Sequence, residues 1–214
     1  MKKNLKVNLI WFGLIIGLFL ILKGLELSGI MNLYYIQILM GIGISILMGL
    51  GTNLVLGFSG QFTLGQAGFM AIGAYSSAII TGMMPTYDGF YLSMVVGVII
   101  AAIVALIFGL PTLRLKGDYL AIVTLAFGEI IKNIINVLYV GIDSNGIHFS
   151  MKDQMSLGME PDGKMIISGA MGITGTPRQS TFTIGVVLIL VTLFVVLNLI
   201  NSRDGRAIMA IRDN

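Results

Sequence analysis

Four polar residues fall on one face of a predicted helix whose other residues are mostly apolar. Glu129, Lys132, Asn133 and Asn136 stand at positions i, i+3, i+4 and i+7, a spacing that places their side chains on one side of the helix. Ionisable groups in a membrane-crossing helix are costly and usually face the bundle interior or water. Two interpretations follow: Glu129 and Lys132 form a buried structural pair, or this face belongs to a transport pathway or its gating.

A second polar feature is the glycine-rich stretch between residues 57 and 69. It contains four glycines, two glutamines, a serine and a threonine. Polar, glycine-rich backbone at membrane depth is tolerated where protein covers it or where it lines a wet cavity, and broken helices mark many transporter paths. A tight turn with close helix packing and a translocation path are both consistent with it. The path candidates are Gly57, Ser59, Gly60, Gln61, Gly65, Gln66, Glu129, Lys132, Asn133 and Asn136.

Enzyme and metal motifs are weak or missing in the sequence. Residues 158–165 read GMEPDGKM, which departs from a phosphate-binding loop because Met165 stands where a hydroxyl would bind magnesium. The chain has no cysteine and one histidine, His148, which argues against thiol catalysis and against cysteine or histidine metal clusters. We therefore expect no catalytic site, no metal and no cofactor, so that energy coupling comes from a partner or an ion gradient.

The composition places these polar features in a membrane protein. Of 214 residues, 56% are hydrophobic and 11% are charged, against about 25% charged residues in soluble domains. A soluble fold needs more charge than this to cover its surface, which excludes an ordinary cytosolic enzyme, a disordered tail and a nucleic-acid partner. We expect an all-α, polytopic transmembrane helix bundle in a lipid bilayer, with residues 1–214 as a single domain.

Six apolar segments are candidate membrane spans, because a helix needs about 20 residues to cross about 30 Å of hydrocarbon. They are residues 7–22, 33–56, 62–84, 90–110, 119–140 and 182–200. Small residues recur every four positions in three of these segments, as in Gly97, Ala101, Ala105 and Gly109. That pattern is typical of helices that pack closely in lipid.

The lysines and arginines orient these spans, because cytoplasmic segments carry an excess of them. Eight of the 13 flank the spans on one side, namely Lys2, Lys3, Lys6, Arg114, Lys116, Arg203, Arg206 and Arg212. The bias predicts that both ends of the chain are cytoplasmic. Residues 141–181 then form a long extracytoplasmic loop, which is either a solvated connector or a docking surface. A loop of this length is usually functional or contains short secondary-structure elements of its own.

Three motifs follow one another along the chain. The first is ISILMGLGTNLVLGFSGQFTLGQAGF at residues 44–69, with IGAY at 72–75; the others are LRLKGDYLAIVTLAFGEI at 113–130 and SRDGRAIMAIRDN at 202–214. Together they resemble the permeases of branched-chain amino acid ABC transporters of the LivM type. Residues 141–147 depart from the usual family pattern. Family members continue beyond the third motif, so the chain is expected to be the front part of a longer permease, truncated at the coupling loop.

The resemblance implies a permease subunit of the bacterial cytoplasmic membrane that imports leucine, isoleucine and valine. Its implied partners are a second homologous permease, two cytoplasmic ATPase subunits that hydrolyse ATP, and an extracytoplasmic binding protein. Residues 201–214 would begin the cytoplasmic segment that contacts the ATPase. The implied contact residues are Arg203, Gly205, Arg206, Ala207, Ala210, Ile211 and Arg212.

Other functions are also consistent with the sequence. A secondary carrier or channel would use Glu129 and Lys132 as a proton or ion relay. A permease for urea or short amides would belong to the same broad family. An intramembrane enzyme has the least support, because no paired carboxylates and no Ser–Lys or histidine constellation can be assigned to facing helices.

Overall fold

The computed structural model describes residues 2–112, 114–115 and 117–212, with side chains described from residue 10 to residue 210 in these ranges. The described residues form helices and one small sheet. Contacts gather in two compact units, residues 1–60 with 180–214, and residues 61–179.

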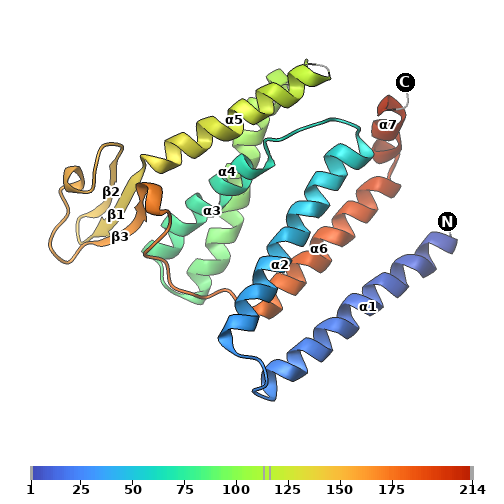
Figure 1. Cartoon of the computed structure of the whole chain (residues 1–214), viewed down its shortest axis with the longest axis horizontal. Coiled ribbons are helices and arrows are strands. Elements are labelled where there is room, and N and C mark those ends of the chain that lie inside the picture. Colours follow the sequence, from blue (N-terminus) through green and yellow to red (C-terminus); the bar gives the residue numbers. More distant parts are fainter. Residues whose placement is uncertain (1, 113, 116, 213–214) are drawn as a thin grey trace. The chain divides into compact units, whose positions relative to one another are not determined.

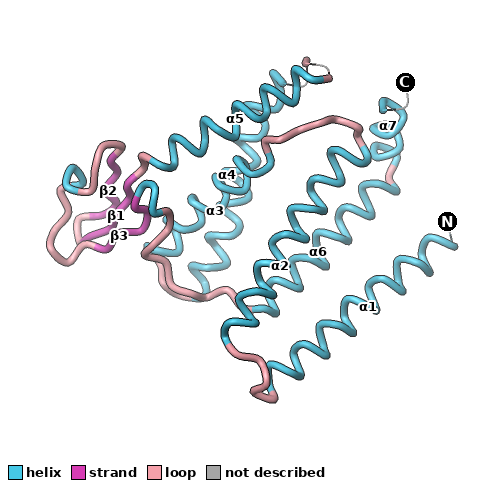
Figure 2. Tube along the Cα trace, viewed as in Figure 1, coloured by secondary structure: helices cyan, strands magenta, loops and turns pink. Residues whose placement is uncertain are grey.

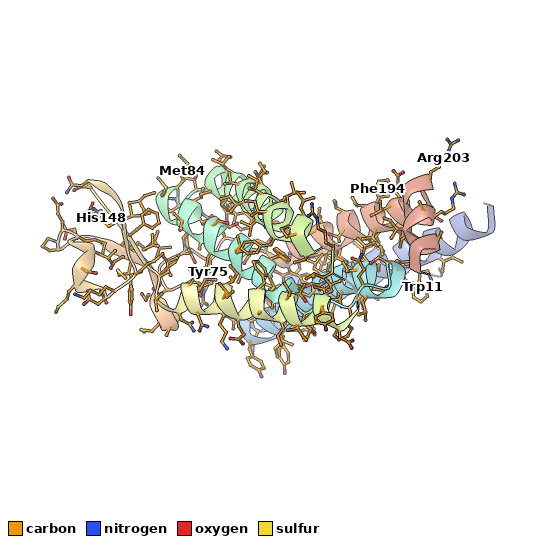
Figure 3. The ribbon with its side chains drawn as sticks, turned by 90° about the horizontal axis from the view of Figure 1, so that it is seen from above. Trp11, Tyr75, Met84, His148, Phe194 and Arg203 are labelled. Carbon is orange, nitrogen blue, oxygen red and sulfur yellow. The ribbon has the colours of Figure 1, made fainter. Side chains whose placement is uncertain are left out.

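The first unit contains long apolar helices (Figure 1). They are α1 (Lys2–Leu27), α2 (Leu33–Thr52), which continues into the π-helix η1 (Asn53–Phe58), and α6 (Phe182–Asn201). A short, polar helix, α7 (Arg203–Arg212), follows α6. Helix α2 packs along α6, and the Phe19 ring of α1 stacks on Phe182 with 5.7 Å between centroids. Trp11 and Phe194, labelled in Figure 3, are each 59% exposed. Large apolar side chains exposed in this way suit a lipid environment.

In the second unit, α3 is the central helix. The unit contains α3 (Gln66–Met83), α4 (Tyr87–Thr112) and α5 (Asp118–Asn136), and α3 contacts both of the others. Buried Gly97 of α4 leaves no room for a Cβ because Ser77 and the Gly73 carbonyl lie against it. Ser77 and Thr81 of α3 both donate hydrogen bonds to Ser93, at 2.9 Å each, to its carbonyl and its hydroxyl respectively. Small residues and hydroxyl bonds therefore join α3 to α4, as expected for helices without a hydrophobic force between them.

A three-stranded antiparallel sheet follows α5 (Figure 2). Its strands are β1 (Tyr139–Asp143), β2 (Gly146–Ser150) and β3 (Lys164–Ser168) in the order β2-β1-β3, with the 3-10 turns η2 (Met155–Leu157) and η3 (Gly169–Met171) beside them. Val140, Ile166 and Ile167 are fully buried and pack with Ala78 of α3. The sheet is thus anchored to α3 by an apolar core.

Four predicted spans are confirmed as helices long and apolar enough to cross a membrane. Among the described residues these are Ile10–Leu27, Leu33–Phe58, Tyr87–Thr112 and Phe182–Asn201. The predicted segments 62–84 and 119–140 also contain helices, α3 and α5, but neither is in that group. The bundle of membrane helices is therefore confirmed, and the number six is approximate.

Several predicted helix boundaries are shifted in the structure, and two of them lie next to the sheet and the non-helical stretch. The helix expected over residues 119–140 ends at Asn136, because Tyr139 and Val140 join strand β1, where β-branched and aromatic residues fit a half-buried pleated surface. The helix expected from residue 62 begins at Gln66, after the non-helical stretch that carries Thr63. The segment 141–181 contains most of the sheet and both 3-10 turns, so it carries elements of its own.

The predicted small-residue stripes differ in what they touch. Gly97 is tightly packed, whereas a Cβ built on Gly13, Gly17, Gly41, Gly49 or Gly109 would meet no described atom within 4 Å. The close helix contact of α4 is therefore confined to one end of its stripe.

We predict that Gly97→Val destabilises the protein while Gly109→Val does not. The two substitutions carry the same helix-propensity change on one helix, but only the first forces a side chain into Ser77 and Gly73. Overpacking of this kind costs about 1–3 kcal/mol. Thermal unfolding of the purified protein in detergent measures the difference, and equal melting temperatures for both variants would contradict the packing described here.

Candidate functional site

The predicted break between two helices is present in the structure. The π-helix η1 ends at Phe58 and no helix forms again until Gln66. Gly60 has a φ of 69°, in the left-handed region that favours glycine. The Leu64 N–H donates a hydrogen bond to Thr124 Oγ1 of α5 at 3.0 Å. The end of the stretch at Leu64, which belongs to the second unit, is therefore held against α5.

Glycines of this stretch allow α3 to approach α5 closely. A Cβ on buried Gly65 would lie 3.1 Å from the Thr124 carbonyl oxygen, and one on Gly68 would lie 3.1 Å from the Phe127 ring. Phe127 is 6% exposed, and its ring packs against those of Phe69 and Phe108, with centroids 4.7 and 4.5 Å away. Of the two interpretations offered by the sequence, close packing describes Gly65 and Gly68.

A groove of about 380 Å³ opens beside this contact, between α3 and α5. Its walls are mainly apolar, and its polar members are Glu129, Lys132, Asn136 and Tyr75. Tyr75, labelled in Figure 3, comes from α3, and the other three come from α5. The complete lining is Leu64, Ala67, Gly68, Ala71, Tyr75, Leu125, Gly128, Glu129, Ile131, Lys132, Ile135 and Asn136.

Glu129 and Lys132 form the predicted ion pair. The Lys132 Nζ lies 3.2 Å from Glu129 Oε1 and 3.3 Å from Oε2. The two side chains are 55% and 63% exposed respectively, so the pair is not buried by the described residues of this chain. An exposed pair adds little to stability. The interpretation as a buried structural pair therefore does not describe its surroundings within this chain.

The structure separates the other path candidates. Asn136 lines the groove, whereas Asn133 is exposed on α5 outside the lining. Gln61 is exposed and Gln66 is half-buried at the start of α3. Gly57 and Ser59 belong with Gly60 to the first unit, where Gly57 lies against the Asn53 side chain and the Ser59 hydroxyl bonds to the Val55 carbonyl at 2.6 Å.

Sequence reasoning missed the α3 side of the groove and the Thr124 contact. Ala67, Ala71 and Tyr75 line one face at a spacing of four residues, which helical periodicity reveals once α3 is known to begin at Gln66. Thr124 gave no such signal, because a threonine within an apolar helix usually bonds its own backbone. Thr124 Oγ1 does donate to the Ala121 carbonyl at 3.0 Å while it accepts from Leu64.

The candidate coupling residues lie on α7, which is fixed to the end of α6. Ser202 caps α7 by accepting a hydrogen bond from the Gly205 N–H at 3.0 Å. Gly205 is buried, and a Cβ there would collide with the Leu199 carbonyl. Arg203 (Figure 3), Arg206, Ala207 and Ala210 are exposed. Ile211 and Arg212 continue the helix, and their side chains lie outside the described residues.

A polar cluster joins the strands of the sheet. Asp143 Oδ1 accepts hydrogen bonds from the Asn145 N–H at 2.8 Å and from His148 Nε2 at 2.9 Å, and Oδ2 accepts one from the Glu160 N–H at 3.2 Å. The Asp143 side chain is 2% exposed. Desolvation raises the pKa of Asp143, but the hydrogen bonds from Glu160, Asn145 and His148 outweigh it and hold this pKa below its usual range.

No metal site is formed by the residues that the structure describes. Among them, no three His, Cys, Asp or Glu side chains gather closely enough to hold an ion. The groove offers a carboxylate, an ammonium, an amide and a phenol beside apolar walls, which is a set for binding and orienting a small polar molecule.

Long apolar helices and a broken, glycine-rich segment define a polytopic helical membrane protein. The family model described as "Branched-chain amino acid transport system / permease component" matches residues 34–214. The chain belongs to this permease family.

Curated relatives agree with the family match. The chain is 35% identical over 156 residues to the high-affinity branched-chain amino acid transport system permease protein LivM of Escherichia coli (strain K12), and 34% identical over 155 residues to the protein of that name from Salmonella typhimurium. Each match covers 68% of this chain and 36% of the relative, so the chain spans little more than a third of the length of these relatives. No solved structure matches it significantly.

We predict that acidification loosens the sheet through Asp143. The pKa of Asp143 in the folded protein lies below its unfolded value of about 3.9. The ionised carboxylate therefore stabilises the sheet above that pH, and this stabilisation is lost as the pH falls through the folded pKa. Hydrogen exchange of the amides in β1 and β2, corrected for intrinsic rates, should show that their protection decreases as the pH is lowered from the unfolded pKa through the folded pKa of Asp143. Asp143→Asn should have lower protection at neutral pH and a shallower pH dependence.

Asp162→Asn is the control for this experiment. Asp162 is an exposed carboxylate of the same segment, and its replacement should leave the pH dependence of the sheet unchanged. An Asp143→Asn variant with the wild-type pH profile would contradict the assignment.

Proposed function

We propose that this chain forms part of the permease subunit of an ATP-driven ABC importer for leucine, isoleucine and valine in the bacterial cytoplasmic membrane. The observation that carries the proposal is the family match over residues 34–214. It extends from α2 to α7 and so includes the broken helix, the groove and the coupling candidates. The printed names of both relatives specify branched-chain amino acid transport.

We propose α7 as the start of the contact with the cytoplasmic ATPase subunits. Its first turn is fixed by the Ser202 cap and by the buried Gly205, so a displacement of α7 would be passed to α6. Arg203 and Arg206 are exposed and available to a partner. Arginine is enriched at protein interfaces because its planar guanidinium group makes several hydrogen bonds.

The sheet is the proposed docking surface for the extracytoplasmic binding protein. Phe149, Met151, Met155 and Met171 of this segment are 61%, 67%, 95% and 80% exposed. Exposed aromatic and methionine side chains are typical of interaction surfaces. A second homologous permease would complete the translocation path, with both ends of this chain on the cytoplasmic side.

We predict that the full-length permease, reconstituted with its ATPases, second permease and binding protein, takes up leucine only while ATP is supplied. Dissipating the ion gradient should leave uptake unchanged, because ATP hydrolysis on the partner supplies the energy. Radiolabelled leucine uptake into proteoliposomes is the measurement. Uptake that persists without ATP and fails in Glu129→Gln would favour the secondary carrier. Uptake of urea or short amides in place of leucine would favour a permease for those substrates.

A charge reversal on α7 tests the coupling assignment. We predict that Arg203→Glu combined with Arg206→Glu lowers co-purification of the ATPase by about tenfold or more, as loss of arginine anchors does at other interfaces. Arg178→Glu, an exposed arginine of the segment between the sheet and α6, should leave co-purification unchanged. Equal recovery of the ATPase with the wild-type protein, the double variant and Arg178→Glu would contradict the role of α7.

A further inference from the structure

The groove between α3 and α5 combines opposite charges with an apolar wall. Glu129 and Lys132 lie on consecutive turns of α5 with their charged atoms 3.2 Å apart, and both line the groove. Leu64 and Leu125 line it as well, with Ile131 and Ile135. Its volume of about 380 Å³ falls at the lower end of the range for small-molecule sites, about 300–1,000 Å³.

We propose that this groove binds the charged end of a free amino acid, with Lys132 on the α-carboxylate and Glu129 on the α-ammonium group. The inference rests on the proposed function and assigns its substrate contacts to two residues. An amino acid at neutral pH carries both charges on one carbon. Adjacent residues of opposite charge therefore match it in sign and in spacing.

Charge balance favours this ligand over an ion or a singly charged molecule. The pair is neutral as a whole, and a zwitterion is neutral too, so binding replaces one ion pair by two and leaves no net charge in the groove. A lone anion or cation would satisfy only one member of the pair and would leave the groove with a net charge. Asn136, one turn beyond Lys132 and also in the lining, offers an amide to the same carboxylate.

The apolar wall fits the branched side chain of such a substrate. Leu64, Leu125 and Ile135 supply apolar surface within the same groove as the charges. Burial of a branched aliphatic side chain against such a wall is favourable. A polar or charged side chain would lose hydration there without gaining a described partner, so the groove selects apolar amino acids.

A merely structural role fits the pair less well. More than half of each side chain is exposed, and an exposed pair at this spacing adds little to helix stability. Ionisable groups are nevertheless costly in a membrane bundle and usually serve a pathway. The exposure leaves both head groups available to a third charged molecule.

The test uses the intact transporter in proteoliposomes, supplied with ATP, binding protein and leucine. Glu129→Gln and Lys132→Met should each lower leucine uptake by about tenfold or more, because each removes a charge-assisted hydrogen bond to the substrate. Co-purification with the ATPase should be retained. Wild-type uptake in both variants would overturn the inference.

The chain offers a matched control pair. Lys23 and Glu26 of α1 are also three residues apart and joined at 2.8 Å, but they lie outside the groove. Lys23→Met and Glu26→Gln should leave leucine uptake unchanged. Losses equal to those at Glu129 and Lys132 would show a general effect of removing ion pairs and would overturn the inference.

A charge swap separates substrate binding from a structural pair. Glu129→Lys with Lys132→Glu keeps an ion pair on α5 but reverses its direction, so a bound zwitterion would turn its side chain away from the apolar wall. We expect the swapped protein to remain defective. Restoration of uptake by the swap would show that only the pair itself matters, and the inference would fail.

Cysteine labelling provides a measurement that does not depend on the charge variants. The chain has no native cysteine, so Leu125→Cys places one thiol in the groove and Ile130→Cys places one on the same helix outside the lining. Leucine should slow thiol labelling at residue 125 and not at residue 130. Labelling at residue 125 that is insensitive to leucine would overturn the inference, even where charge variants fail to assemble.

The two proposals fail in different ways. A wild-type transporter without ATP-dependent leucine uptake contradicts the proposed function itself. A wild-type transporter that takes up leucine, with variants at Glu129 and Lys132 that do the same, contradicts only the assignment of the groove.

Discussion

The close approach of α3 to α5 is the contact on which the second unit depends. It requires that Gly65 and Gly68 carry no side chain, because Thr124 and Phe127 occupy the space in front of them. The hydrogen bond from the Leu64 N–H to Thr124 then holds the non-helical stretch in place at 3.0 Å. Without this contact the two walls of the groove would not face each other, and Glu129 and Lys132 would lose the α3 wall opposite them.

The packing of α3 against protein on several sides explains why its sequence is less apolar than that of a lipid-facing span. It packs against α5 through Gly68, against α4 through Ser77 and Thr81, and against the sheet through Ala78. A helix covered by protein on several sides gains more from small residues and hydroxyl bonds than from large apolar side chains. The helices with the most exposed large side chains, such as α1 and α4, are those with the composition of membrane spans.

The sheet and α7 are held in place by different interactions. In the sheet, the buried Asp143 carboxylate accepts three hydrogen bonds and fixes the turn after β1. In α7, the Ser202 cap and Gly205 fix a short helix to the end of α6. Both devices tie a segment outside the long helices to its neighbours, and a surface that is already ordered loses less conformational entropy when a partner binds.

The sequence by itself determined the membrane class, four of the six predicted spans, the broken segment after residue 57 and the pairing of Glu129 with Lys132. Composition and helical spacing act locally, and so they can be read along the chain. Only the tertiary structure decided that Gly65 and Gly68 serve packing, that residues 139–140 leave the helix for a strand, and that the α3 face of Ala71 and Tyr75 meets the charged pair. These outcomes depend on which distant segments touch, because a buried strand and a helix end compete for the same apolar residues and the winning contact lies elsewhere in the chain.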